Sequence, residues 1–264
     1  MTTTAQPFDA NIANWKEYQD APWGRLRYSI AHANLNRHLP QRPLNILDAG
    51  GGNGFDAIAC ATQGHMVTLV DFSTEMLTEA RRTAEAHGVA ERMTVHQADV
   101  AAIPTLFPEP VFDVALCHNI VQYVDDATEL LRAVGHPLKR DGLLSLMSIN
   151  PESETYRQAL MQLDPAAALA SLDATMGFAV AFGVPVHRRN AANMIELLES
   201  ASYTVLKRYG IRCVTDYMPN NDIKSDPAFF ARLEQLEYAL SDRHPYSLLA
   251  RFFQIVARKA DFED

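Results

Sequence analysis

The 264-residue chain has few cysteines and no evident metal-binding pattern. Cys60, Cys117 and Cys213 are far apart in the sequence, and each has apolar neighbours. We therefore expect free thiols in a reducing compartment, with neither a disulfide framework nor a cysteine-held metal. The nine histidines also lack the spacing of metal ligands.

The sequence also lacks long apolar runs and an excess of positive charge. No stretch of about eighteen consecutive apolar residues is present, so we expect no membrane span. The first residues lack the basic and apolar pattern of a secretory signal, which favours a cytoplasmic protein. A net charge of −9 gives no general footprint for nucleic acid or membrane, although a local basic patch is compatible with it.

Apolar segments alternate with helix-forming segments over residues 23–149. Apolar strands without polar alternation, separated by helices, are typical of a parallel sheet that is covered on both faces. The expected strands are 45–49, 65–71, 93–97, 111–118 and 143–149. Helices are expected at 23–38, from 53, at 73–87 and at 126–134, with Ser73 as N-cap of the third.

The alternation changes after Asn150. Residues 154–182 are mostly helix-forming and rich in alanine, and we predict a helical lid insertion over 151–190. A helix at 191–201, a strand at 203–214, a helix at 226–240 and a strand at 251–258 follow. The predicted fold is one α/β domain over 1–264, with a doubly wound, seven-stranded mixed sheet that ends in an antiparallel edge hairpin.

A glycine-rich turn follows the first predicted strand, in the segment Asp48-Ala-Gly-Gly-Gly-Asn-Gly54. The next predicted strand ends on a carboxylate, Asp71. Glycines at a strand-to-helix turn allow a ligand to approach the backbone closely, and an acid at the next strand end can accept hydrogen bonds from ribose hydroxyls. Together these features predict a site for a cofactor that contains adenosine.

The spacing of the turn distinguishes between three cofactor classes. A nicotinamide dinucleotide site requires a third glycine where Phe55 stands, and a phosphate-binding loop requires a Gly-Lys-Ser/Thr sequence that is absent. The pattern Asp48-x-Gly-x-Gly-x-Gly instead resembles motif I of the class I S-adenosylmethionine (SAM)-dependent methyltransferases. This resemblance implies SAM as cofactor, and its implied binding residues are Asp48, Gly50, Gly51, Gly52, Gly54, Asp71, Phe72, Met76, Asp99 and Val100.

Segments outside this core narrow the resemblance. Gly24-Arg-Leu-Arg27, Thr215-Asp-Tyr-Met218, Pro245-Tyr-Ser-Leu-Leu and Val256-Ala-Arg-Lys259 look like the bacterial tRNA 5-carboxymethoxyuridine methyltransferases. Enzymes of that family esterify the carboxylate of a modified wobble uridine. The resemblance implies that Arg27 binds the carboxylate of SAM and that His118 completes the cofactor shell.

The middle of the chain departs from that family. Residues 174–186 are uncharged, whereas the family members carry lysines in this region. We therefore expect a small-molecule acceptor, with nitrogen, hydroxyl or carboxylate all open, and keep tRNA as the alternative. A tRNA enzyme should display a continuous basic surface formed by Arg25, Arg157, Arg188, Arg189, Lys207, Arg208, Arg212 and Lys224. A non-catalytic SAM-binding protein is the alternative of another class.

Candidate acceptor-site residues follow from their positions near the expected strand ends. His118 is the candidate catalytic residue, either orienting SAM or acting as base, although a hydrogen-bonded loop histidine would also fit. A base is needed only where the nucleophile must lose a proton, which a carboxylate does not. Tyr28, Tyr123 and Tyr156 can present ring faces to a sulfonium, and Arg188 and Arg189 can bind an anion; each also fits an ordinary core or surface position.

Overall fold

A computed structural model describes residues 4–260 and contains a central seven-stranded sheet. The strand order is β3-β2-β1-β4-β5-β9-β8. The bounds are β1 (Asn45–Ala49), β2 (Met66–Asp71), β3 (Met93–Gln97), β4 (Phe112–His118), β5 (Leu138–Ile149), β8 (Tyr203–Ile211) and β9 (Phe252–Lys259). The doubly wound, mixed sheet that the sequence predicts is confirmed.

The last strand enters the sheet rather than ending it. Strands β1 to β5 pair in parallel, whereas β9 runs antiparallel between β5 and β8. The predicted antiparallel edge pair is therefore confirmed, and β8 is its outer strand. Since β9 is reversed, its first residue lies at the same sheet edge as the carboxyl ends of its neighbours.

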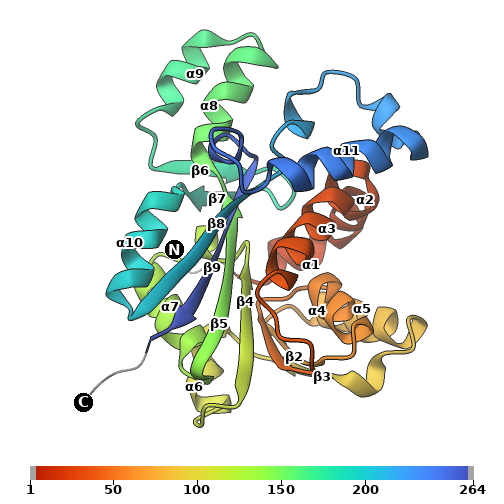
Figure 1. The fold of residues 1–264 in the computed structure, drawn as a ribbon, viewed down its shortest axis with the longest axis vertical. Helices are drawn as coiled ribbons and strands as arrows, with labels where there is room; N and C mark the ends of the chain where they lie inside the picture. The colour runs from red at the N-terminus through yellow and green to blue at the C-terminus, as the bar shows by residue number, and fades with distance from the viewer. Residues whose placement is uncertain (1–3, 261–264) are drawn as a thin grey trace.

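Two groups of helices cover the sheet (Figure 1). One face carries α3 (Pro22–Asn36), α4 (Phe55–Thr62) and α5 (Thr74–Ala86). The other carries α6 (Ile103–Leu106), α7 (Ala127–Gly135) and α10 (Ala191–Ser200). No helix within residues 4–260 has both the length and the hydrophobicity that a membrane crossing requires.

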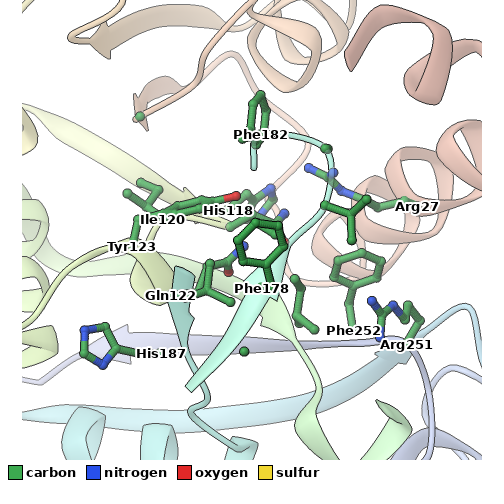
Figure 2. A pocket seen from close by; sticks show the side chains of 18 of the residues that line it. Arg27, His118, Ile120, Gln122, Tyr123, Phe178, Phe182, His187, Arg251 and Phe252 are labelled. Atoms are coloured by element: carbon green, nitrogen blue, oxygen red, sulfur yellow. The ribbon is translucent and has the colours of Figure 1, made fainter. Parts of the chain in front are cut away.

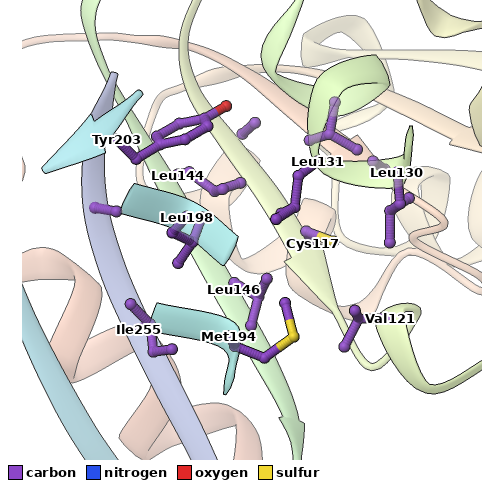
Figure 3. Close-up of a cluster of buried hydrophobic side chains, with 14 of the residues drawn as sticks. Cys117, Val121, Leu130, Leu131, Leu144, Leu146, Met194, Leu198, Tyr203 and Ile255 are labelled. Carbon is purple, nitrogen blue, oxygen red and sulfur yellow. The ribbon is translucent and has the colours of Figure 1, made fainter. Parts of the chain in front are cut away.

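The larger core lies between the sheet and the second group of helices (Figure 3). Leu131 of α7, Leu146 of β5 and Met194 of α10 are inaccessible to solvent. The absence of polar alternation in β5 has a simple cause, because helices cover both of its faces. This burial fixes α7 and α10 against the sheet. The loops that precede these helices lie near the carboxyl ends of the parallel strands.

Short polar side chains fix the helix starts that frame the site. Ser73 Oγ accepts a hydrogen bond from the amide of Met76 at 3.1 Å, which confirms the predicted N-cap of α5. Asp126 caps α7 through the amides of Thr128 and Glu129 in the same way. Each cap satisfies amides that have no partner within the helix.

The segment 151–190 differs from the predicted helical insertion. Helices α8 (Pro151–Leu160) and α9 (Pro165–Ser171) are followed by a two-stranded hairpin, β6 (Met176–Ala179) and β7 (Val184–His187). The prediction of helix through residue 182 is wrong beyond Ser171, because the hairpin buries Ala179, Phe182 and Val184 against other parts of the chain. Tertiary packing here overrides the local helix propensity.

Two further helices precede α3, and the sequence analysis did not anticipate them. They are α1 (Gln6–Ala10) and α2 (Ile12–Asp20), and they pack beside α5 and α3. Within α2, the side chain of Gln19 exchanges hydrogen bonds with that of Asn53 in the glycine turn, at 2.6 and 3.1 Å. Helix α2 is thereby joined directly to the glycine turn.

The C-terminal helix α11 (Pro227–Leu240) anchors the loop that follows β8. Glu237 is fully buried, and its carboxyl oxygens accept hydrogen bonds from the amides of Cys213 (2.5 Å), Val214 (3.1 Å) and Thr215 (2.8 Å). The Thr215 hydroxyl donates to the same group. One side chain thus satisfies most of the polar groups of a loop that has left the sheet.

We expect Glu237→Ala to lower the free energy of unfolding by about 3 kcal/mol, because it leaves several buried donors without acceptors. The matched control is Glu234→Ala, one turn earlier on α11 and without a buried carboxyl group, which should change stability little. Urea unfolding of both variants measures the difference. Equal stability of the two variants would show that Glu237 does not hold the loop.

Candidate active site

A cavity of about 1760 Å³ lies at the carboxyl ends of the parallel strands. The residues that follow β1, β2, β3 and β4 all contribute to its lining, including Gly50, Phe72, Asp99 and Asn119. Its other walls come from α1, α2, α8 and the β6–β7 hairpin. This is the edge at which open α/β sheets bind ligands.

The glycine turn and the end of β2 form one hydrogen-bonded unit. The amide of Gly52, whose φ is +55°, donates to Asp71 Oδ2 at 2.9 Å, and the amide of Ser73 donates to Asp71 Oδ1 at 2.9 Å. Burial raises the pKa of Asp71, and these backbone hydrogen bonds oppose that rise. Each carboxyl oxygen keeps acceptor capacity, so the group remains able to receive the hydroxyls of a ribose.

Asp48 lies directly beneath the turn. A Cβ on Gly51 would come within 2.4 Å of Asp48 Oδ2, so only glycine fits above this carboxyl group. Burial, together with the neighbouring Asp56 and Asp71, raises the pKa of Asp48 well above its ordinary value. Asp48 Oδ2 is buried and has no hydrogen-bond partner among the described residues. Such an atom is suited to a donor on a ligand, for example an amino group.

Arg27 projects from α3 into the same cavity (Figure 2). Only 4% of the residue is exposed, and its Nε has no hydrogen-bond partner among the described residues. Its guanidinium lies over the rings of Tyr28, Trp15 and Phe252, at 4.6, 5.2 and 5.5 Å from the ring centroids. A buried arginine that faces aromatic rings and forms no ion pair within residues 4–260 is suited to an anionic ligand.

Aromatic rings from distant parts of the chain close over the glycine turn. Phe182, at the hairpin, contacts Phe8 and Trp15 with ring centroids 4.7 and 5.0 Å apart. Phe8 in turn meets the edge of Phe72 at 5.5 Å and of Tyr123 at 5.3 Å. This cluster joins α1, α2 and the β6–β7 hairpin into a cap that shields part of the cavity from water.

His118 belongs to a buried polar network. Its Nδ1 lies 3.1 Å from Asp56 Oδ2 and its Nε2 lies 2.8 Å from Ser145 Oγ, while His32 holds the other Asp56 oxygen at 2.8 Å. Because Gln254 donates to Ser145 Oγ at 3.0 Å, the Ser145 hydroxyl is free to donate to Nε2, which leaves the His118 proton on Nδ1 toward Asp56. Burial alone would raise the pKa of Asp56, but His118 and His32 lower it.

Most of the sequence-predicted site residues line this one cavity. Those that do are Arg27, Tyr28, Asp48, Gly50, Gly51, Gly52, Asp71, Phe72, Met76, Asp99, Val100, His118, Tyr123 and Arg188. Gly54 lies outside its lining and packs against Ala80. Tyr156 is also outside the lining, about half exposed, with its ring 6.2 Å from that of Tyr217.

Arg189 and the expected basic surface differ from the sequence-based interpretation. Arg189 donates to the carbonyls of Val121 (2.5 Å), Val124 (2.9 Å) and Asp125 (2.7 Å), so it ties the loop after β4 in place. Arg212 and Lys224, two members of the continuous basic surface that a tRNA enzyme was expected to display, are buried. Arg212 donates to the Tyr18 hydroxyl and Lys224 to the carbonyl of Thr215, so neither charge contributes to an exposed basic surface.

Comparison with known proteins accords with this geometry. A family described as "Methyltransferase domain" matches residues 41–223. The chain is 31% identical over 255 residues to the tRNA 5-carboxymethoxyuridine methyltransferase of Escherichia coli (strain K12), with 91% of each chain covered. The chain belongs to the SAM-dependent methyltransferases. Its cofactor is therefore SAM rather than a nicotinamide dinucleotide.

Two other similarities are informative for their extent. The ubiquinone biosynthesis O-methyltransferase of Xylella fastidiosa is 30% identical over 128 residues, which is 48% of this chain and 50% of that protein. The crystal structure of the Burkholderia thailandensis 1,6-didemethyltoxoflavin-N1-methyltransferase, with bound S-adenosylhomocysteine, covers 97% of this chain and 89% of its own, with a TM-score of 0.56 at 19% identity. The fold is thus shared with a protein of low sequence identity. Sequence similarity extends over most of this chain for the Escherichia coli protein, but over only half of it for the Xylella fastidiosa protein.

The residues of the cavity fit SAM on their own chemistry. The unpartnered Arg27 guanidinium suits the carboxylate of the methionine part, the unpartnered Asp48 oxygen suits its amino group, and Asp71 suits the ribose. Sequence reasoning missed Asp56 and the residues of α1 and α2. It also missed Arg251, although a residue just before a reversed strand must lie at the edge that carries the site.

We expect Arg27→Met to weaken SAM binding about ten-fold or more, because a buried carboxylate would lose a charge-assisted fork of hydrogen bonds. The protein should remain folded, since methionine fills a similar space without a buried charge. Arg25→Met, on the same helix but exposed, is the matched control. Calorimetric titration gives the affinity; unchanged affinity with a lowered melting temperature would make Arg27 a packing residue.

Proposed function

We propose that this methyltransferase esterifies the carboxylate of 5-carboxymethoxyuridine in tRNA. The observation that carries the proposal is the extent of the similarity to the Escherichia coli enzyme, which covers 91% of both chains. An alignment of that length must include most of residues 151–260, which build the part of the cavity beyond the glycine turn. The similarity to the Xylella fastidiosa O-methyltransferase covers only about half of the chain.

The cofactor shell follows from the unpartnered polar atoms. Arg27 binds the SAM carboxylate, Asp48 the amino group and Asp71 the ribose hydroxyls, while the amide-bearing turn Gly50–Gly52 lies against the sugar and methionine. Phe72, Met76, Asp99 and Val100 surround the adenine. These roles are supported by the shared cavity and by the close contact that only glycine allows above Asp48.

The state of His118 supports a carboxylate acceptor. Both ring nitrogens are engaged, with Asp56 and with Ser145, so His118 would have to break a buried hydrogen bond to accept a proton from a substrate. A carboxylate needs no such step, because it is already ionised near neutral pH. Of the two roles considered for His118, orienting SAM or acting as base, we therefore favour the first, a positioning role.

SAM held by Arg27, Asp48 and Asp71 would supply an electrophilic methyl carbon; its transfer to the acceptor oxygen would break the carbon–sulfur bond with the electron pair left on sulfur, so the carboxylate would become a neutral ester and the sulfonium a neutral thioether. The protein contributes alignment and a dry site, since both reactants lose charge during the step. The aromatic cap formed by Phe8, Trp15 and Phe182 provides the exclusion of water.

The decisive experiment incubates the protein and SAM with tRNA that carries 5-carboxymethoxyuridine. We expect the methyl ester of that nucleoside after digestion and mass spectrometry, and no methylation of the same tRNA with 5-methoxyuridine. Small carboxylic acids, amines and phenols are tested in parallel under the same conditions. Efficient methylation of one of these, with none of tRNA, would replace the proposal with the small-molecule acceptor that the sequence first favoured.

We further expect single-turnover methyl transfer to be independent of pH between about 6 and 8, where the acceptor carboxylate stays ionised. A base-dependent amine or phenol acceptor would instead give a rate that rises with pH as its proton is removed. Rapid-quench measurements with saturating SAM separate this step from product release. A ten-fold rise in rate per pH unit would contradict a mechanism without a base.

A further inference from the structure

Three chain segments meet beside Arg27 and bring arginines together. Strand β5 ends at Ile149, β8 ends at Ile211, and the reversed β9 begins at Phe252, and these residues are paired in register. The amide of Arg251 donates to the carbonyl of Arg212 at 3.1 Å, so these two residues are adjacent at the sheet edge. Helix α8 starts immediately after β5 and adds Glu154 and Arg157 to the same place.

Charges in this part of the cavity are unbalanced. The guanidinium groups of Arg157, Arg188, Arg212 and Arg251 and the carboxyl groups of Glu154 and Asp216 all line it. Arg212 and Asp216 form a closed, buried pair through two hydrogen bonds, one of them at 2.7 Å. This pair accounts for one positive and one negative charge.

Two of the remaining three arginines hydrogen-bond to Glu154, and one of these, Arg157, also lies 4.0 Å from Asp216. Glu154 Oε2 accepts from Arg251 at 2.7 Å and from Arg157 at 3.2 Å. Burial alone would raise the pKa of Glu154, but Arg251, Arg157 and Arg188 lower it. Arg188 itself donates only to a backbone carbonyl, that of Pro151, at 3.1 Å among the contacts of the described residues.

An unpartnered donor also remains within this group. Arg157 Nε is buried without a hydrogen-bond partner among the described residues, and it forms a long ion pair with Asp216 Oδ1 at 4.0 Å. With Arg212 included, four guanidiniums around the carboxylates of Glu154 and Asp216 leave an excess of positive charge in a partly enclosed space. Like charges held this way repel one another, and an anion from outside relieves the repulsion.

We infer that Arg157, Arg188 and Arg251, here called the arginine cluster, bind the carboxylate of the methyl acceptor. This inference deepens the proposed function and rests on it for the identity of the acceptor. A planar carboxylate matches the fork of donors that a guanidinium presents. Without an acceptor, Glu154 is the carboxylate that pairs with Arg157 and Arg251. The acceptor carboxylate then binds to the same arginines and to Arg188.

The cluster also distinguishes acceptor from product. The acceptor is anionic and is attracted by the excess of positive charge, whereas its methyl ester is neutral and loses that attraction. Arg27 is not a member of this cluster: its guanidinium lies over the Phe252 ring, 5.5 Å from the centroid, whereas Arg157 and Arg251 pair with Glu154 and Arg188 donates to the carbonyl of Pro151. The cavity thus has one cationic group for each of two carboxylates, that of SAM and that of the acceptor.

Phenoxyacetate is a suitable probe, because it carries a carboxymethoxy group on a flat ring and does not require tRNA. Its affinity is measured calorimetrically on protein loaded with S-adenosylhomocysteine, with methyl phenoxyacetate as the neutral control. Arg188→Met should weaken phenoxyacetate binding about ten-fold, since a charge-assisted pair is lost. Arg232→Met, exposed on α11 and outside the cavity, should leave it unchanged.

Glu154→Gln provides an opposite readout that a purely structural role would not give. Removing the internal acid should strengthen phenoxyacetate binding, because the carboxylate no longer competes with Glu154 for Arg157 and Arg251. If Glu154→Gln fails to fold, Arg188→Met still decides the question, because within residues 4–260 the Arg188 side chain donates only to the backbone carbonyl of Pro151. No binding of phenoxyacetate to wild type, or equal binding by wild type and Arg188→Met, overturns the inference. An equal loss of S-adenosylhomocysteine affinity in Arg188→Met would also overturn it, by assigning the cluster to the cofactor.

A second arm separates a carboxylate from RNA phosphates. Binding of wild type and Arg188→Met is compared on tRNA with 5-carboxymethoxyuridine and on the same tRNA with 5-methoxyuridine. We expect the variant to lose affinity only for the first. Equal loss on both would indicate a phosphate contact and overturn the inference. Charge-selective phenoxyacetate binding with no tRNA methylation would refute the proposed tRNA function and leave the arginine cluster as a carboxylate site.

Discussion

The reversed strand β9 is the constraint on which the proposed acceptor half of the cavity depends. Because it lies antiparallel between β5 and β8, its first residue is placed at the edge where those strands end. Arg251 and Arg212 become neighbours for this reason, although they are far apart in the sequence. A parallel strand in the same place would put its start at the opposite edge of the sheet and leave Arg251 far from the cavity.

A second constraint is the polar network around Asp56, which crosses the interior from α4 to the sheet. Asp56 holds His32 of α3 and His118 at the end of β4, and Ser145 of β5 and Gln254 of β9 extend the chain of hydrogen bonds. Every link fixes one element of the site relative to another. Such a network favours a function in positioning, because moving a proton through it would disturb several buried partners at once.

The sequence predicted the strands, the turn and the helix starts around the glycine-rich segment well because these features are local. The turn from Asp48 to Gly54, the N-cap Ser73 and the strand-ending Asp71 follow one another closely, and their spacing alone indicates a strand, a tight turn and a helix. The strands and helices framing them are correspondingly close to their predicted bounds. The acceptor half is assembled from segments that only the register of β9 brings together, which no local pattern in the sequence records.

The β6–β7 hairpin after α9 is a second feature that local sequence patterns did not predict. Residues 176–182 belong to a segment with helix-forming composition, yet they form part of a hairpin in which Phe182 is buried against Phe8 and Trp15. Likewise, Arg189 looked like an anion-binding residue beside Arg188, but three carbonyl groups of the loop after β4 occupy it. Adjacent arginines in the sequence thus have different roles, which depend on what the tertiary structure places against each.

The negative net charge of the chain opposes the binding of tRNA, the proposed acceptor. A chain with net charge −9 repels a polyanion at long range, so general electrostatic steering does not bring tRNA to it. The positive charge available at the cavity is concentrated in Arg157, Arg188 and Arg251 and is shielded from solvent in part. Selectivity under these conditions comes from short-range recognition of one carboxylate rather than from many phosphate contacts. An acidic protein of this kind would discriminate strongly between modified and unmodified nucleosides while binding the rest of the RNA weakly.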